Sequence, residues 1–583
     1  MTDGPQPLQT VPRSSRLFDA AWFLFWAVLS SVWCVTAASQ LSATFDEPLH
    51  LERGLERWRT GSTAGLMSLG AMPLPMDVET LPLYLWERCH GIRLDPVGNL
   101  DHLLPWARAS ALLFWWVLLF YAWRLARSFG GPWAARLAVA YLACEPNFLA
   151  HASLALTDTA VTACLLVLVY HFRAGRDGGW LRRVGVPAVC FAAAVLAKAS
   201  GLAYAGLCMI VIEAERRLAP VWDGDAKVTA KALWTALWRR PARGTFRGDL
   251  VQIVLLGLGL VFVYCGSDWQ PQTSGLAWAR SLPPGPFGIC MVWFFEHARV
   301  FSNAGEGIVR QVRHNMLGHG VYVLGQVYPR YVWYYYPLVL TIKLCEPLLF
   351  APVVLLIVRP RSLRNAAALS ALVLLLFSLN AHVQIGVRLM LPLVALAVVG
   401  VSAAAVNAVR SFRPGTSARI AVGFCVASVL WCGVASWAVW PSGLTYVNRM
   451  WGDPTDGYRL VSDSNWDWGQ GVKELARWQR RRGDGSLDVW YFGSDPRIDR
   501  APLRALALHG LSFDKPEEVG QYLRGRRLAV STTLAYGCLY GLAPSARVAQ
   551  HFLATQKPVG RTSTFLIYDF TADGAAGNAA SSP

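Results

Sequence analysis

Residues 387–406 read VRLMLPLVALAVVGVSAAAV, and Arg388 is the one charged residue in this stretch. About 20 consecutive apolar residues are enough for an α-helix to cross the hydrocarbon core of a bilayer. Such a helix satisfies its own backbone hydrogen bonds, as the hydrocarbon core requires. The stretch therefore predicts a spanning helix and an α-helical membrane protein.

Further apolar segments of this kind begin near Ala20, Trp106, Pro132, Leu156, Arg183, Gly201, Leu250, Pro337, Asn365 and Arg419, so we expect about eleven transmembrane helices. Composition points the same way, because 54% of the 583 residues are hydrophobic and only 16% are charged. Soluble domains carry about a quarter charged residues. The 26 Trp and 19 Tyr are typical of aromatic belts at two membrane interfaces.

Basic residues gather in the short loops between these segments, as at Arg124 and Arg127, Arg182 and Arg183, and Arg410. If the N-terminus is cytoplasmic, every such loop lies in the cytoplasm, as the positive-inside rule requires. The net charge of +17 then reflects topology, and we expect no nucleic-acid partner. We predict a multi-pass protein of the bacterial cytoplasmic (inner) membrane with an extracytoplasmic C-terminus.

This topology divides the chain into a transmembrane domain at 1–440, an extracytoplasmic α/β domain at 441–570 and a disordered tail at 571–583. Two long loops of the first domain, 42–105 and 267–336, are external. They contain apolar-aromatic stretches too short to span, TLPLYLW (80–86) and YPRYVWYYYP (328–337). We predict that these stretches form interfacial helices, with membrane lipids as partners.

The region after residue 440 alternates two kinds of pattern. YRLVSDS (458–464), SLDVWYFG (486–493), RLAVSTT (527–533) and TFLIYDF (564–570) are typical of strands. GQGVKELARWQRR (469–481), PEEVGQYL (516–523) and SARVAQHFLATQ (545–556) are typical of helices. Such alternation predicts a small α/β layer structure.

Cations at the outer ends of spans need an explanation, since the positive-inside rule supplies none. Lys198 ends the fifth span, Lys343 lies two turns into the eighth, and Arg388 opens the tenth. Converging at one depth, these three would suit an anionic head group such as a lipid phosphate. The alternative is that each side chain snorkels to the interface and binds nothing. Arg108, at the start of the second span, is the best candidate for a purely structural role.

Acidic residues lie at the same membrane level. Asp46 and Glu47 follow the first span, and Asp158 opens the fourth. A carboxylate at the boundary of water and lipid can serve as a general base when its surroundings tune its pKa. The alternatives are helix capping or a salt bridge to one of the outer cations.

Other polar residues are candidates for substrate contact. His151 and His319 lie in the external or membrane-edge segments, and Tyr335 belongs to an aromatic stretch that can stack on a sugar ring or form part of an aromatic belt. A further group of polar residues comprises Asp463, Asp467 and Gln470. It either binds the acceptor or forms an ordinary strand-to-helix turn with an Asp cap. The His spacing matches no metal-ligand pattern and the 12 Cys form no CxxC pair, so we expect no cofactor, with a divalent metal left open.

Several of these stretches, in this order, resemble the glycosyltransferase C superfamily, in the branch of the protein O-mannosyltransferases and the lipid A aminoarabinose transferase. TFDEPLH (44–50) is similar to the first acidic motif of that branch, and EPNFLAHASLALTDTA (145–160) to the second. LAKASGL (196–202), GHGVYVLGQ (318–326), WYYYPLVLTIKLCEP (333–347) and IGVRLMLP (385–392) resemble further stretches of bacterial members. SDSNWDWGQGVKELARW (462–478) and VWYFGSDP (489–496) resemble the extracytoplasmic part of a bacterial subgroup.

The resemblance implies an inverting transferase that moves a sugar from a polyprenyl-phosphate donor to a hydroxyl of a lipid, glycan or protein acceptor. Asp46 would be the general base, Glu47 would orient it or share its role, and Asp158 would position acceptor or base. The donor phosphate would be held by Lys198, Lys343 and Arg388. Fixed cations would stabilise the leaving phosphate more in the transition state than in the ground state.

The chain departs from the family pattern in two places. Residues 70–86, GAMPLPMDVETLPLYLW, follow the Pro-Pro-Leu motif only loosely, which affects the acceptor side of the site. LTIKLCEP (340–347) replaces the commoner Lys-Thr-Pro.

Two other classes of protein fit the same charges. Intramembrane charges also mark the substrate paths of transporters and flippases, although those usually show repeated halves, and the chain shows none. A non-catalytic partner in envelope-polysaccharide assembly is the second alternative. The enzyme hypothesis requires Asp46 to lie within about 15 Å of at least one of Lys198, Lys343 and Arg388, the span that one sugar phosphate and its side-chain partners can bridge.

Overall fold

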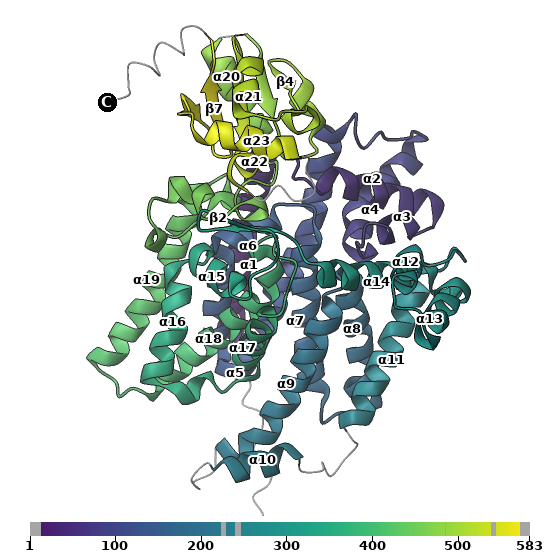
Figure 1. Ribbon diagram of the computed structural model, residues 1–583. Coiled ribbons are helices and arrows are strands. Elements are labelled where there is room, and N and C mark those ends of the chain that lie inside the picture. Colours follow the sequence, from purple (N-terminus) through teal and green to yellow (C-terminus); the bar gives the residue numbers. More distant parts are fainter. Residues whose placement is uncertain (1–12, 223–228, 239–245, 484, 538–543, 572–583) are drawn as a thin grey trace, which may run out of the picture.

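The computed structural model describes residues 13–222, 229–238, 246–483, 485–537 and 544–571. Within them a bundle of long helices carries a small sheet at one end, while the short helix α10 (Ala230–Trp238) lies at the other end (Figure 1). By length and composition, five of the described helices can cross a membrane: α1 (Arg13–Gln40), α5 (Leu100–Cys144), α11 (Phe246–Cys265), α18 (Leu391–Ser411) and α19 (Thr416–Val439). The number rises to as many as seven if each of two bent helix pairs forms one span.

All eleven predicted spans fall on helices. The segments beginning near Trp106 and Pro132 both lie in α5, which bends at Gly131, where φ is 76°. The others include α8 (Val186–Ala197), α9 (Gly201–Trp222) and α17 (Ala366–Ser378). The helical membrane fold is therefore confirmed, while the number of crossings stays a prediction.

The bundle has an inside and a lipid-facing outside. Of the 18 most apolar consecutive residues in the span that contains α18, 78% are buried inside the protein. The corresponding share is 22% in α1 and in α19, so α18 is central. Side chains on peripheral helices point outward, and Val263 and Trp437 are each 81% exposed. Apolar surface on this scale is stable only in contact with lipid.

Small residues let the central helices approach closely. A Cβ atom on Gly400 of α18 would lie 2.4 Å from the backbone nitrogen of Ala368 in α17, and one on Gly130 of α5 would lie 2.9 Å from the Cα of Ala403. In lipid, association depends on this close van der Waals packing because no hydrophobic force drives one helix onto another.

Two pairs of consecutive helices are sharply bent where the candidate site residues lie. α6 (Pro146–Ala152) and α7 (Thr157–Gly175) meet at 110°, and α15 (Tyr335–Lys343) and α16 (Glu346–Val358) meet at 113°. Pro146 opens α6 after an extended Glu145, as proline requires of the residue before it. These breaks place polar side chains at the end of the bundle that faces the C-terminal region.

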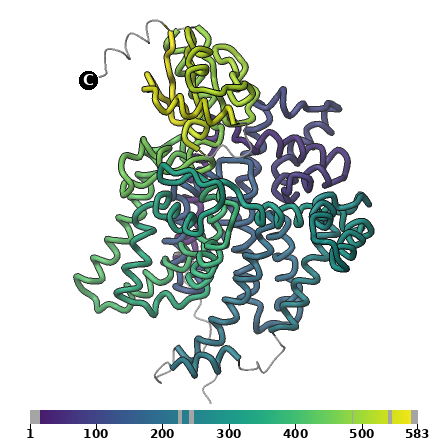
Figure 2. Tube along the Cα trace, in the orientation of Figure 1, coloured from purple at the N-terminus to yellow at the C-terminus, as the bar shows by residue number. Residues whose placement is uncertain are grey.

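The two loops predicted to be external are helical. The first contains α2 (Glu47–Thr60), α3 (Ala64–Met67) and α4 (Pro73–His90), and the second contains α12 (Thr273–Arg280), α13 (Pro286–His297) and α14 (Ser302–Leu317). The two loops lie side by side (Figure 2), and Gln311 donates a hydrogen bond to the carbonyl of Gly70. TLPLYLW lies within α4 as predicted, but YPRYVWYYYP is not one helix, because β2 (Gln326–Tyr328) and turns precede the start of α15 at Tyr335.

The C-terminal region forms a five-stranded sheet in the order β4-β3-β5-β7-β6. β3 (Leu487–Trp490) pairs in parallel with β4 (Leu503–Ala505) and with β5 (Arg527–Ser531). β7 (Phe565–Asp569) pairs antiparallel with β5 and with β6 (Gly560–Arg561). Helices α20 (Val472–Arg482), α21 (Pro516–Leu523) and α23 (Pro544–Ala554) accompany the sheet. The predicted α/β structure is confirmed, with one error.

That error is the strand predicted at YRLVSDS (458–464). Its first two residues end a 3₁₀ turn (Pro454–Arg459), and Val461 forms an isolated bridge with Val323. The segment packs against the hairpin of β1 (Val321–Val323) and β2 and against α22 (Thr532–Tyr536), and it does not pair in the five-stranded sheet. The boundary predicted at 441 stays a prediction, and of the predicted tail at 571–583 all but Thr571 lies outside the described residues.

Candidate active site

Asp46 stands at the start of α2 with its carboxylate unused by the helix. It occupies the N-cap position but makes no capping hydrogen bond, which removes the capping alternative. Instead, its Oδ2 lies 3.4 Å from a terminal guanidinium nitrogen of Arg388, and its side chain is 33% exposed. Asp46 therefore lies well within the expected 15 Å of a cation and can be reached from outside.

Glu47, its neighbour, is buried in a fixed network. Its two oxygens accept hydrogen bonds from the Arg108 guanidinium at 2.8 and 2.7 Å, from the Thr44 N–H at 2.8 Å and from the Ala155 N–H at 2.9 Å. Burial raises the pKa of Glu47, but Arg108 and these N–H groups outweigh burial and hold it below its usual value. Glu47 therefore anchors the loop that presents Asp46, with Arg108 as its structural partner.

Asp158, Lys198 and Arg388 form the buried side of the site. Asp158 lies in the first turn of α7, and its Oδ1 accepts a hydrogen bond of 2.5 Å from the Lys198 ammonium, which follows α8. Its Oδ2 lies 3.6 Å from the same Arg388 nitrogen that faces Asp46. Arg388, in the short turn η4 (Val387–Met390), thus joins the two carboxylates.

Polar atoms around this cluster lack partners. Among the described residues, Asp158 Oδ2, Arg388 Nε, His151 Nδ1 and His50 Nδ1 are buried and make no hydrogen bond. A buried polar atom without a partner costs about 1–3 kcal/mol, so four in one place indicate a site whose hydrogen bonds are completed by a ligand or by solvent.

A cavity of about 570 Å³ opens onto the cluster. Asp46 and Arg388 line it on the membrane side, together with His319 and Tyr335. The opposite wall belongs to the C-terminal region and includes Asp463, Trp468, Tyr491, Phe492, His509 and Thr533. The size is that of a typical small-ligand pocket.

The segment 463–468 connects the sheet to the cluster. Arg388 lies 4.0 Å from the centre of the Trp468 ring, a cation–π contact. Asn465 Oδ1 accepts a hydrogen bond of 2.8 Å from the Val387 N–H, and its Nδ2 donates one of 2.9 Å to the Tyr335 hydroxyl. This segment therefore fixes both the backbone and the side chain of Arg388.

Asp463 faces the cavity from the same segment. Its φ of 57° is in the left-handed region, which costs a non-glycine residue energy and is concentrated at functional sites. Burial raises the pKa of Asp463, while the Arg388 guanidinium acts in the opposite direction. The predicted grouping splits here, because Asp467 turns away from the cavity and accepts hydrogen bonds from the Gly469 and Thr533 N–H groups.

Lys343 does not lie in the cavity, contrary to its predicted role at the phosphate. It is 1% exposed, and its ammonium donates to three backbone carbonyls, those of Leu444, Tyr446 and Asn465, at 2.8, 2.5 and 2.7 Å. An ammonium has three N–H donors, so none is left for a phosphate. The sequence singled out Lys343 as a cation that needs a partner, and the structure shows that this partner is the backbone of the segment 444–465.

The predicted substrate-contact residues differ in position. His319 and Tyr335 line the cavity, whereas His151 is buried in α6 within electrostatic range of Asp158 and outside the cavity lining. Sequence reasoning overlooked His50, although it follows Asp46 by four residues, the spacing that places two side chains on one helix face. No comparable signal marked Asn465 or Trp468, whose roles depend on tertiary contacts.

Among the described residues, no group of three or more His, Cys, Asp or Glu side chains is arranged to hold a metal ion. The arrangement that is present pairs carboxylates with cations at the edge of a cavity. Such a site can take a proton from a hydroxyl and stabilise an anionic leaving group.

No family model matches this chain, and no curated protein matches it significantly. Among solved structures, it is similar to ArnT from Cupriavidus metallidurans bound to undecaprenyl phosphate, with 15% identity, coverage of 94% of this chain and 97% of that one, and a TM-score of 0.30. The apo state of the same protein gives 13% identity with equal coverage and TM-score. An Archaeoglobus fulgidus oligosaccharyltransferase in complex with zinc and sulfate gives 10% identity, coverage of 88% and 68%, and a TM-score of 0.35. Because all three TM-scores are below 0.5, the function of this chain has to follow from its own residues.

Proposed function

We propose that this chain is an inverting glycosyltransferase, which transfers a sugar from a polyprenyl-phosphate donor to a hydroxyl acceptor at the extracytoplasmic membrane face. The observation that carries the proposal is the position of Arg388, 3.4 Å from Asp46 and 3.6 Å from Asp158, at the edge of the cavity. The motifs that resemble the glycosyltransferase C superfamily supply these same residues.

Arg388 and Lys198 are the proposed phosphate ligands. One terminal nitrogen of Arg388 faces the carboxylates, while its Nε has no partner and remains available as a donor. The guanidinium fork matches the spacing of phosphate oxygens. The Lys198 side chain is 22% exposed, and its ammonium pairs with one oxygen of Asp158, whose other oxygen lies 3.6 Å from Arg388.

Asp46 is the proposed general base. The acceptor oxygen attacks the anomeric carbon of the sugar while the Asp46 carboxylate takes its proton. The bond between that carbon and the phosphate oxygen breaks, and its electron pair stays on the phosphate, whose added charge Arg388 and Lys198 stabilise. A single displacement inverts the anomeric configuration and releases polyprenyl phosphate.

The position of the cavity suits such a donor. Its lining joins Arg388, at the start of α18, to residues of the C-terminal region, so a polyprenyl tail can stay among the spans while the sugar occupies the cavity. The site needs no nucleotide, and the sequence contains no Gly-rich nucleotide loop.

The test compares Asp46→Asn with Glu52→Gln, a charge removal on the same helix outside the cavity lining. Each variant is returned to a deletion strain, and glycolipids and glycoproteins of the envelope are analysed by mass spectrometry. We expect Asp46→Asn to lower transfer at least about 100-fold, the usual contribution of a general base, and Glu52→Gln to leave it unchanged.

Binding of undecaprenyl phosphate to the purified variants completes the test. Asp46→Asn should bind it as well as the wild type does, whereas Arg388→Ala should bind it weakly. Full transfer by Asp46→Asn would disprove the enzyme mechanism and favour a scaffold. Sugar movement without transfer by the purified wild type would favour a transporter.

A further inference from the structure

The helix α20 carries a concentration of positive charge that the proposed chemistry does not use. Its eleven residues, VKELARWQRRR, include five cations and one acid. The positive-inside rule offers no reason for cations here, because this region is on the side opposite the basic loops. The contacts of these cations supply the reason instead.

α20 lies on the outer end of the first spanning helix. The Lys473 ammonium donates a hydrogen bond of 2.9 Å to the Ser39 carbonyl, and the Lys473 N–H donates one of 2.7 Å to the Ser42 hydroxyl. Arg477 donates a hydrogen bond of 2.5 Å to the Gln40 side chain. Since α1 ends at Gln40, these contacts place the basic helix at the level of lipid head groups.

A cavity of about 390 Å³ opens beside α20, and its described lining contains five cations and no acid: Lys473, Arg477, Arg480, Arg497 and Arg500. Two carboxylates outside this lining neutralise part of the charge. Asp495 pairs with Arg497, and Asp101 pairs with Arg497 and lies 3.6 Å from Arg500. Five cations against two carboxylates leave an excess of three positive charges.

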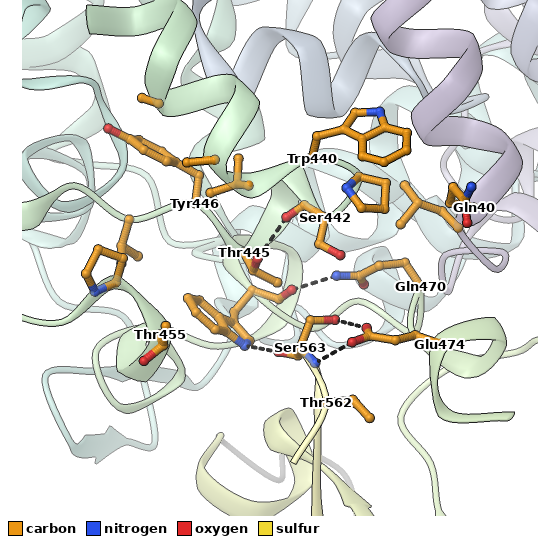
Figure 3. Close-up of a pocket in the computed structure, with 18 of the residues that line it drawn as sticks. Gln40, Trp440, Ser442, Thr445, Tyr446, Thr455, Gln470, Glu474, Thr562 and Ser563 are labelled. Carbon is orange, nitrogen blue, oxygen red and sulfur yellow. Dashed lines mark hydrogen bonds between the residues drawn. The ribbon is translucent and has the colours of Figure 1, made fainter. Parts of the chain in front are cut away.

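A second cavity, of about 960 Å³, lies on the other side of α20 and shares Gln40 and Arg477 with the first (Figure 3). Its upper wall in Figure 3 includes Trp440, at the end of α19. The apolar lining from that helix comprises Trp431, Val434, Ala435, Ala438 and Val439. Trp440 donates a hydrogen bond of 3.3 Å to Thr36, so the outer ends of α19 and α1 are adjacent.

We propose that the cavity beside α20 binds the phosphate head group of an anionic membrane lipid whose chains lie against the outer ends of α1 and α19. The charge excess matches a phosphate, and the adjoining apolar helix ends match acyl chains. A soluble phosphate would use the first feature but not the second. The lipid site is separate from the Arg388 cavity and does not depend on the proposed transfer.

The Lys473 ammonium adds a second readout. Its burial and the nearby Arg497 and Arg108 lower the pKa of Lys473 to about 8, while Asp101 and Asp495 oppose this shift. A bound phosphate adds negative charge and so favours the protonated ammonium. Lipid affinity should therefore fall as the pH rises above 8.

The experiment is a thermal-shift titration of the full chain in detergent with dioleoyl phosphatidylglycerol, dioleoyl phosphatidylcholine or inorganic phosphate. A ligand that binds only the folded chain raises its melting temperature. We expect phosphatidylglycerol to bind best. The double variant Arg480→Gln, Arg500→Gln should bind it about 25-fold more weakly, at roughly fivefold for each cation removed.

The matched control removes two exposed cations outside the lining, by Arg482→Gln and Arg524→Gln, and should keep the wild-type affinity. Arg388→Ala should keep it as well, which separates this site from the proposed donor site. Unchanged binding by the Arg480, Arg500 double variant would overturn the proposal. So would equal weakening in the control, or stabilisation by inorganic phosphate equal to that by phosphatidylglycerol.

Discussion

Asp46 and Glu47 are adjacent acids with different surroundings. Asp46 is 33% exposed and faces Arg388 across 3.4 Å, whereas Glu47 is buried and its oxygens accept hydrogen bonds from Arg108 and two N–H groups. A base must be able to reach and release a proton, which Asp46 can do and Glu47 cannot. The carboxylate of Glu47 holds the loop in place instead.

Glu47→Gln is therefore expected to destabilise the protein. Loss of one partner of a buried ion pair leaves Arg108 with an uncompensated charge, which costs about 3–5 kcal/mol. Denaturation in detergent, followed by tryptophan fluorescence, measures the change in unfolding free energy. Asp46→Asn serves as the control and should change it by less than about 1 kcal/mol; a Glu47→Gln protein of wild-type stability would contradict this role.

Trp468 is expected to act through Arg388. The ring lies 4.0 Å from the guanidinium, and a desolvated cation–π contact contributes about 1–2 kcal/mol. Trp468→Leu should therefore weaken undecaprenyl phosphate binding about 5- to 30-fold, whereas Trp468→Phe, which keeps an aromatic face, should weaken it less. Equal affinities for the Leu and Phe variants would show that the ring does not position Arg388.

At the scale of elements, the two broken helix pairs bring distant chain segments together. The break between α15 and α16 places Lys343 where the segment 444–465 returns from the last span. One buried ammonium then satisfies three carbonyls of a segment that lacks regular secondary-structure pairing. The clamp holds this segment, and with it Asn465, against the start of α18.

Lys343→Met should release this clamp. Three buried carbonyls lose charge-assisted hydrogen bonds, each with a net contribution of about 1.5–3 kcal/mol, so we expect a loss of at least about 3 kcal/mol in unfolding free energy. Because Asn465 also positions Arg388, binding of undecaprenyl phosphate should weaken only together with this loss of stability. Weak binding at unchanged stability would instead restore the predicted role of Lys343 at the phosphate.

Asp467 predicts a pH dependence of stability. Burial raises the pKa of Asp467 to about 7 in the folded chain, above the ordinary value of 3.8. Between about pH 4 and pH 7 the unfolded chain loses this proton first, so Asp467 makes stability fall as pH rises through this range. Below pH 4 and above pH 7 its contribution to the slope vanishes.

Asp467→Asn removes this titration. Melting temperatures measured every half unit from pH 4 to pH 8 should fall less steeply in the variant than in the wild type. Asp456→Asn, at an exposed carboxylate paired with Arg561, is the control and should keep the wild-type profile. Parallel profiles for Asp467→Asn and the wild type would contradict the raised pKa.

At the scale of the whole molecule, the orientation in the membrane is open to a direct test. Cys89 and Cys290 are the exposed cysteines of the described residues, and both lie in loops predicted to be external. A membrane-impermeant maleimide should label both in intact spheroplasts, because the basic loops hold the opposite face in the cytoplasm. Peptide mass spectrometry identifies the labelled sites.

The control is the triple variant Cys89→Ser, Cys290→Ser and Cys538→Ser, in which the last substitution removes a cysteine of the predicted extracytoplasmic region that lies outside the described residues. It should take up no label before lysis. Labelling of Cys89 and Cys290 only after lysis would reverse the proposed topology.

The sequence by itself determined the membrane fold and the C-terminal α/β pattern, and it singled out the charged residues of the candidate site. These properties depend on local periodicity, on segment length and on the cost of placing a charge in lipid, all of which can be read along the chain. Hence the amino-acid sequence is enough to select Asp46, Asp158, Lys198 and Arg388 as site residues. That they lie together is a property of the tertiary structure.

Only the tertiary structure decided which partner each of these groups has. Lys343 and Lys198 have similar depth and equal charge, yet the ammonium of Lys343 meets three carbonyls and that of Lys198 meets Asp158. The strand predicted at 458–464 failed for the same reason, since this segment contacts the β1–β2 hairpin and does not pair in the five-stranded sheet. Depth follows from the chain's own hydrophobicity, whereas pairing depends on segments distant in the chain, which a linear pattern does not encode.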